Sequence, residues 1–282
     1  MAQSSVAQSS ATASSDELPA DTSSREIKFR GGGFMPSSRP LAVYIAFFSI
    51  IAVWEIAVRT RVLNPLFLPA PSTIASAFWE LVESGMLWKH LSVSLQRILT
   101  GWAIGSLLGI AVGLAMGLWS LTRSVGLAFV SALFPIPKIA LLPLIILWLG
   151  IGEASKISII ALGVFFPTTI SVYSGVDGVP RNLIRMAQSF GLSHAEIIRK
   201  IVLPGALPNI ISGFRITTSV ALLTLVAAEM IGAQYGIGAF VLQTGNMMLT
   251  DQLLAGVAVL SIMGLCTSWI LSRLERTLFT WR

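Results

Sequence analysis

Ionisable and hydroxyl side chains inside long apolar runs are the residues of this sequence best suited to act on a solute. Lys138 stands between Pro137 and Ile139 in one such run, where an ionisable group is costly and therefore suggests a function. Its ammonium group would attract a sulfonate, a nitrate or another oxyanion. Alternatively, Lys138 is structural and pairs with a carboxylate, for which Glu229 near the end of a later run is the candidate. The sequence leaves both interpretations open.

Three further residues are candidates for a solute path. Thr217 and Thr218 place hydroxyls on the same run as Glu229, although Ser and Thr in membrane helices commonly bond to their own backbone. Phe166 precedes Pro167, where a kink would position its ring. The predicted translocation pathway therefore consists of Lys138, Thr217, Thr218, Glu229 and Phe166.

Several kinds of chemistry are excluded by what the sequence lacks. His90 and His194 are too far apart and too isolated to indicate a metal site, and the single Cys266 allows no intrachain disulfide. The chain contains no His-Glu-x-x-His, no Gly-x-Ser-x-Gly and no phosphate-binding Gly-x-x-x-x-Gly-Lys-Ser/Thr sequence. We therefore expect no enzyme activity, no catalytic residue, no metal and no cofactor in this chain.

Composition indicates the elements that must position these residues. Hydrophobic residues make up 54% of the 282 residues and charged residues 11%, whereas about 25% of a soluble domain is charged. We therefore expect much of the surface to face lipid. The net charge of +6 does not indicate nucleic-acid binding, because the basic residues are scattered between apolar runs.

Six apolar runs are each near the ~20 residues that span a bilayer. They cover residues 41–58, 98–118, 125–149, 157–176, 211–231 and 253–271, and the third is interrupted by Pro135, Pro137 and Pro143. The predicted fold class is therefore all-α, a polytopic membrane protein with about six transmembrane helices. Two outer connections are expected to be structured, with a surface helix starting at Pro71 and a segment over 234–252 that re-enters the protein.

Residues 1–39 are expected to form a disordered cytoplasmic tail before a membrane domain over 40–282. The tail is rich in Ser, Ala, Asp and Gly, and it lacks the basic and apolar regions of a secretory signal. With the N-terminus inside, most of the 19 Lys and Arg residues lie in cytoplasmic segments. Lys138 aside, the outer segments hold only Arg59, Arg61, Lys89, Arg97 and Lys156. The positive-inside rule then predicts that both termini are cytoplasmic.

Glycine recurs at every fourth position of the second run. Such a stripe allows another helix to approach closely in a membrane. The predicted packing seam consists of Gly101, Gly105, Gly109, Gly113 and Gly117.

The long cytoplasmic loop over 177–209 has the pattern of a docking element. A helix is predicted from Pro180 to Gly191, with Leu183, Met186, Ala187 and Phe190 on one apolar face. Ser193 caps a second helix, which we expect to end at Leu203-Pro204. Two short helices with exposed apolar residues on a membrane protein indicate a binding surface for a soluble partner.

The spacing from Ala187 to Gly191 and on to Ile201-Val202-Leu203-Pro204 resembles the EAA loop of binding-protein-dependent ABC importer permeases. The sequence departs from that pattern at its start, where Arg185 replaces the glutamate and Met186 the first alanine. By this resemblance, the ATPase-docking residues are Arg185, Met186, Ala187, Ser189, Gly191, Ser193, Ile201, Leu203 and Pro204. The resemblance also implies that two ATPase subunits carrying ATP and Mg²⁺ dock beneath a pair of permease chains.

Further motifs narrow the resemblance to one branch of the family. Leu68-Pro69-Ala70-Pro71-Ser72 and Ala227-Ala228-Glu229-Met230-Ile231 look like the nitrate, sulfonate, taurine and bicarbonate branch, and Leu274-Glu275-Arg276 favours taurine and alkanesulfonates. The implied partners are a second permease copy, a periplasmic binding protein and the lipids of a bacterial inner membrane. Alternatives are the same machine carrying nitrate or bicarbonate, or a self-sufficient secondary transporter or channel.

Overall fold

The computed structural model describes residues 40–278, and every regular element in this range is a helix. The elements are α1 (Pro40–Arg59), α2 (Pro71–Glu83), α3 (Met86–Leu118), α4 (Ser120–Leu133), the 3-10 helix η1 (Lys138–Leu141), α5 (Leu142–Leu149), α6 (Glu153–Asp177), α7 (Arg181–Ser189), α8 (His194–Ile197), the π-helix η2 (Ile198–Val202), α9 (Leu203–Met230), α10 (Ile237–Asn246) and α11 (Thr250–Leu278). The all-α class is confirmed. The expected disordered tail over 1–39 lies outside the described residues.

The number of apolar helices agrees with the six predicted runs. In the described part of the chain, 5 helices are long and apolar enough to cross a membrane, or 6 if the bent pair of α4 and η1–α5 forms one span. This pair bends by 84° at the predicted proline-rich interruption, because Pro135 and Pro137 cannot continue a helix and Pro143 lies in the first turn of α5.

The start of the second span differs from the prediction. α3 begins at Met86 rather than near Ile98, and its 33 residues extend over about 50 Å, more than the ~30 Å core of a bilayer. The polar stretch before Ile98 is helical because His90, Ser94 and Arg97 are buried against other parts of the protein. The polar residues before Ile98 mark the end of the apolar run, but the helix continues through them.

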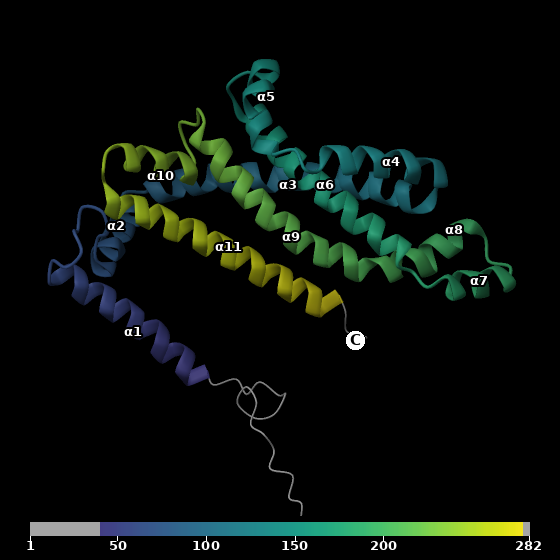
Figure 1. Cartoon of the computed structure of the whole chain (residues 1–282), viewed down its shortest axis with the longest axis horizontal. Coiled ribbons are helices and arrows are strands. Elements are labelled where there is room, and N and C mark those ends of the chain that lie inside the picture. The colour runs from purple at the N-terminus through teal and green to yellow at the C-terminus, as the bar shows by residue number, and fades with distance from the viewer. Residues whose placement is uncertain (1–39, 279–282) are drawn as a thin grey trace, which may run out of the picture. The chain divides into compact units, whose positions relative to one another are not determined.

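Close packing of α3 against α6 confirms the glycine seam. A Cβ atom on Gly109 would lie 2.7 Å from Cβ of Thr168, and one on Gly117 would lie 2.5 Å from Cγ1 of Val176. Neither glycine can carry a side chain without separating the two helices. α9 packs along another side of α6 (Figure 1), so that α6 is buried between α3 and α9.

Both connections that were predicted to be structured contain helices. α2 begins at Pro71, as its sequence predicted, and buries Ala77 and Leu81. The segment between α9 and α11 contains α10, whose Ile237 to Phe240 are all buried in contact with α9, α11 and α3 (Figure 1). This segment therefore packs into the protein, as expected.

The docking loop has two helices, but the second does not end where predicted. α8, η2 and α9 form one uninterrupted helical stretch from His194 to Met230, so Pro204 does not terminate it. Proline removes an i→i−4 hydrogen bond, and the wider π turn of η2 directly before it accommodates this loss. The loop is consequently continuous with the fifth long helix.

Candidate functional site

The docking loop presents an exposed apolar surface. Leu183, Met186 and Phe190 are 41%, 51% and 77% exposed, and they recur on one side of α7. Arg181 and Arg185 are also exposed and form no ion pair among the described residues. We call Arg181, Leu183, Arg185, Met186 and Phe190 the docking face. Its apolar and basic character suits a partner with an apolar cleft and acidic rim.

Ala187 does not belong to this face, contrary to the prediction. It is only 3% exposed and packs in a cluster with Val176, Val179 and Ile197. Its small side chain belongs to the hydrophobic cluster that joins α7 to α8 and to the end of α6. In this conformation Ala187 therefore packs α7 against neighbouring helices.

Hydrogen bonds define the bend between α7 and α8. Gly191 adopts φ = +73°, a conformation that favours glycine, and the Gly191 N–H donates to the Gln188 carbonyl at 3.0 Å. Ser193 and Glu196 form a capping box, in which the Ser193 N–H donates to the Glu196 carboxylate at 3.0 Å. Ser189 donates to the Met186 carbonyl at 2.8 Å. These contacts hold the loop in one shape.

The remaining predicted docking residues lie where the loop joins α9. Ile201 is half-buried, whereas Leu203 and Pro204 are exposed. Together they form the π turn and the first turn of α9. Their position connects the docking face to the long helix.

Lys138 lies at the break between α4 and η1. Its Nζ donates to the carbonyls of Leu133, Phe134 and Ile136 at 2.8, 2.9 and 2.7 Å. An ammonium group has three donors, and here all three are donated to backbone carbonyls at the helix break. The Leu133 carbonyl also accepts from the Ile136 N–H at 3.2 Å. Nζ also lies 4.6 Å from the centre of the Phe166 ring, which brings two predicted pathway residues together.

The proposed ion pair of Lys138 with Glu229 is not formed. Glu229 instead accepts from Nη1 of Arg97 at 2.9 Å, with both side chains at most 3% exposed. Arg97 also forms a two-pronged ion pair with Glu153 at 2.6 Å, and the Glu153 side chain is 60% exposed. Arg97 thus joins α3 to the beginning of α6 and the end of α9. We call Arg97, Glu153 and Glu229 the charge cluster.

The charge cluster also holds the segment between α9 and α10. Arg97 Nη1 donates to the Tyr235 carbonyl at 2.6 Å, and the Gly238 N–H donates to the Glu229 carboxylate at 2.8 Å. The carboxylate thereby neutralises the positive end of α10. Nearby, the Ile237 N–H donates to Ser94 at 2.8 Å. Gly236, at φ = +135°, lets the chain turn against these groups.

The other residues predicted at the pathway are largely enclosed. Thr217 is fully buried and accepts from the Trp102 indole at 3.1 Å, while Thr218 donates to the Phe214 carbonyl at 2.7 Å. Phe166 is 6% exposed. In this conformation, Thr217, Phe166 and Glu229 serve packing and hydrogen bonding.

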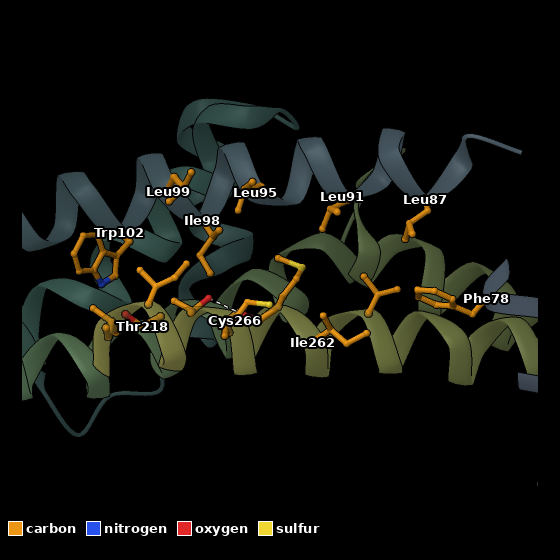
Figure 2. Close-up of a pocket in the computed structure, with 16 residues that line it drawn as sticks. Phe78, Leu87, Leu91, Leu95, Ile98, Leu99, Trp102, Thr218, Ile262 and Cys266 are labelled. Carbon is orange, nitrogen blue, oxygen red and sulfur yellow. Dashed lines mark hydrogen bonds between the residues drawn. The ribbon is translucent and has the colours of Figure 1, made fainter. Parts of the chain in front are cut away.

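An apolar groove of about 500 Å³ runs between α3 and α11, with α2 and α9 closing parts of it. Figure 2 shows leucines of α3 along one side and Ile262 and Cys266 of α11 along the other. Its hydroxyls, Thr218 and Thr267, already donate to backbone carbonyls. The groove therefore suits hydrocarbon and offers no hydroxyl proton to an oxyanion.

Two functional features were missed by the sequence analysis. Arg97 and Lys156 were counted only as charges of the outer segments, although Lys156 is 4% exposed and donates to the Gly152 carbonyl at 3.1 Å. The pairing of Arg97 with Glu229 has no local pattern. The sequence offered one indication of it, because Arg97 is an ionisable residue directly beside the apolar run that starts at Ile98.

Comparison with known proteins gives the same architecture and a specific family. Residues 105–280 match the model of the binding-protein-dependent transport system inner membrane component. The taurine transport system permease protein TauC of Escherichia coli (strain K12) is 38% identical over 264 residues, which cover 92% of this chain and 94% of TauC. SsuC of Bacillus subtilis (strain 168), a permease protein provisionally named for aliphatic sulfonates, is 36% identical over 233 residues, covering 83% of this chain and 84% of SsuC.

Solved structures agree on the fold. The inward-facing MetNI methionine ABC transporter matches with a TM-score of 0.59 and 24% identity, covering 71% of this chain and 96% of that chain. An amino acid ABC transporter solved with histidines matches with a TM-score of 0.53 and 17% identity, again covering 71% and 96%. At these identities, the likeness shows the shared fold alone.

Proposed function

Since this chain belongs to the family of binding-protein-dependent transport system inner membrane components, we propose that it imports taurine or an alkanesulfonate as the permease subunit of an ATP-driven transporter. The observation that carries this proposal is the 38% identity with TauC across 92% of the chain. A similarity of this extent includes the docking loop, the charge cluster and the broken third span. The cargo class follows by similarity, because the pathway residues named above do not by themselves select one oxyanion.

The energy for import comes from separate ATPase subunits, to which ATP and Mg²⁺ bind. The docking face supports this assignment, because one structured loop exposes three apolar side chains and two arginines that form no ion pair among the described residues. In this account, the loop and both chain termini are cytoplasmic. The chain itself performs no chemical step.

Movement of the ATPases reaches the opposite side of the membrane along a continuous helix. The uninterrupted stretch from His194 to Met230 contains 37 residues, which corresponds to about 55 Å. At one end it joins the docking face, and at the other Glu229 contacts Arg97 and the N-terminus of α10. A displacement of the docking face would therefore act on the charge cluster without a flexible joint between them.

The remaining partners follow from the surface. Leu147 and Leu223 are 78% and 74% exposed, and such apolar side chains require lipid or another protein chain as their surroundings. A second copy of this permease would complete the pathway between the two chains. A periplasmic binding protein would deliver the solute to the end that contains α10.

Uptake by intact cells tests the cargo. Labelled taurine, an alkanesulfonate, nitrate and bicarbonate would be supplied to cells with the gene, without it, and with the gene restored. We expect loss and recovery of taurine or alkanesulfonate uptake alone. Loss of nitrate or bicarbonate uptake instead would contradict the sulfonate assignment while retaining the importer.

A further inference from the structure

We propose that the pocket between the end of α9 and α10 binds the translocated oxyanion through uncharged N–H donors. The substrate class in this proposal rests on the proposed function, whereas the pocket and its donors belong to this chain. The pocket has a volume of about 500 Å³ and lies at the end of α9 remote from the docking face. It is lined by Glu229, Met230, Gly232, Ala233, Gln234, Ala239, Leu242, Gln243, Asn246 and Met247.

Three primary amides border this one space. Gln234, Gln243 and Asn246 are exposed, and their side chains have no hydrogen-bond partner within residues 40–278. Each amide group carries two N–H donors. Gln243 and Asn246 lie three positions apart on α10, which places them on the same side of the helix. These groups can donate to the oxygens of a sulfonate.

The backbone before α10 supplies further donors. The N–H groups of Gly232, Ala233 and Gln234 donate to no protein group in the described part of the chain. Gly232 has φ = +71°, so the chain turns sharply where these N–H groups occur. Consecutive backbone N–H groups in a turn form concave sites for anions.

The charge cluster gives this turn a fixed geometry. Behind the turn, Arg97 binds the Tyr235 carbonyl, Ser94 binds the Ile237 N–H, and Glu229 binds the Gly238 N–H. Nδ1 of His90 lies within 3.1 Å of the Gly236 N–H. Donors held by a rigid support bind an anion without first losing conformational freedom. This explains why Arg97 and Glu229 are buried directly behind N–H donors that carry no charge.

The charges around the pocket favour weak, reversible binding of the anion. No Lys or Arg lines the pocket, and the carboxylate of Glu229 is fully buried and compensated by Arg97. Elsewhere, Arg97 is occupied by two carboxylates and Lys138 by three carbonyls. Neutral donors bind an anion more weakly than a guanidinium group does, which allows the anion to leave again.

The first test measures binding and does not depend on transport. The complete transporter in lipid nanodiscs, with ¹⁵N-labelled Gln and Asn, would be titrated with methanesulfonate and, separately, with chloride at equal ionic strength. We expect saturable shifts of the Gln243 and Asn246 side-chain amides with methanesulfonate only. Gln96, an exposed glutamine on α3 outside the pocket, is the matched reference. Shifts no larger than those of Gln96 would overturn the proposal.

The second test measures transport by the same complex. The double variant Gln243→Glu/Asn246→Asp keeps the side-chain shapes but replaces donors by carboxylates, so taurine uptake should fall about tenfold or more. Gln96→Glu should transport as the wild type does, and ATP hydrolysis should persist in both. Equal uptake by the double variant would overturn the anion site. A wild-type complex that imports no taurine would instead contradict the proposed cargo, while the methanesulfonate titration still decides the site.

Discussion

The guanidinium group of Arg97 and the carboxylate of Glu229 meet at 2.9 Å, although 132 residues separate them in the sequence. Arg97 lies on α3 and Glu229 at the end of α9, and the two side chains are 3% and 0% exposed. Ser94 also donates to Glu229 at 2.7 Å. This buried and hydrogen-bonded pair fixes the end of α9 against α3, and it supports the turn that precedes α10.

Arg97→Ala should strongly destabilise the permease. It leaves the buried Glu229 carboxylate without its cation, a change that costs about 3–5 kcal/mol. The melting temperature of the purified permease would be measured by tryptophan fluorescence. The matched control is Arg59→Ala, because Arg59 pairs with Glu55 but its side chain is 70% exposed, and exposed pairs contribute about 0–1 kcal/mol. Equal melting temperatures for the two variants would contradict the structural role of Arg97.

Gly109→Ala should prevent α3 and α6 from packing correctly. The new Cβ would lie 2.7 Å from Thr168 Cβ and 2.9 Å from the Phe165 carbonyl oxygen, so the helices must separate. We expect this to lower the free energy of unfolding by about 1–3 kcal/mol. Gly152→Ala is the control, because its Cβ meets nothing within 4 Å and its backbone is extended. Size-exclusion profiles and melting temperatures should distinguish the two. Normal behaviour of Gly109→Ala would mean that the seam is looser than described.

Lys138→Met should lower stability more than it changes the apparent affinity for the solute. The substitution leaves the carbonyls of Leu133, Phe134 and Ile136 without their shared donor, and we expect a loss of about 1–3 kcal/mol. Lys200→Met is the control, since Lys200 forms an exposed i,i+4 pair with Glu196. Melting would be compared with the KM for uptake. A raised KM with unchanged melting would identify Lys138 as a contact of the solute.

Phe190→Ala should separate the permease from its ATPase without unfolding it. Phe190 is 77% exposed on the docking face, so its removal creates no cavity in the permease. It does remove a large apolar contact from the interface with the ATPase. A dominant contact of this kind contributes about 2 kcal/mol or more to the binding free energy. Co-purification of the ATPase with tagged permease measures the effect. Phe67→Ala, at a residue 70% exposed but remote in sequence from the loop, should retain the ATPase. Retention by both variants would place the ATPase elsewhere.

Local patterns predicted those features whose causes are local. Prolines in the third apolar run indicated the 84° bend, the spacing of glycines indicated the α3–α6 seam, and Pro71 indicated the start of α2. The docking loop was also found, because caps and exposed apolar residues occur close together in the sequence. Each of these features depends on residues within a few helical turns.

Features that depend on distant partners, or on an irregular backbone path, were missed or misplaced. Nothing near Arg97 in the sequence indicates Glu229, and Ala187 resembled its apolar neighbours until the helix was packed on α6. A carboxylate partner was one of the two interpretations of Lys138, whereas the broken helix beside it provided three carbonyls. Pro204 appeared as a helix end because the compensating π turn cannot be recognised from residue types. Tertiary contacts decided the cases of Arg97 and Ala187, whereas the local backbone path, a broken helix and a π turn, decided those of Lys138 and Pro204.

The most direct test of the account is taurine accumulation in proteoliposomes. Vesicles would contain the permease alone, or the permease with its ATPase subunits, and both would receive the binding protein and ATP on the appropriate sides. The account predicts accumulation against a gradient only when the ATPase and ATP are both present. Accumulation by the permease alone, driven by an ion gradient, would contradict it and identify a self-sufficient transporter.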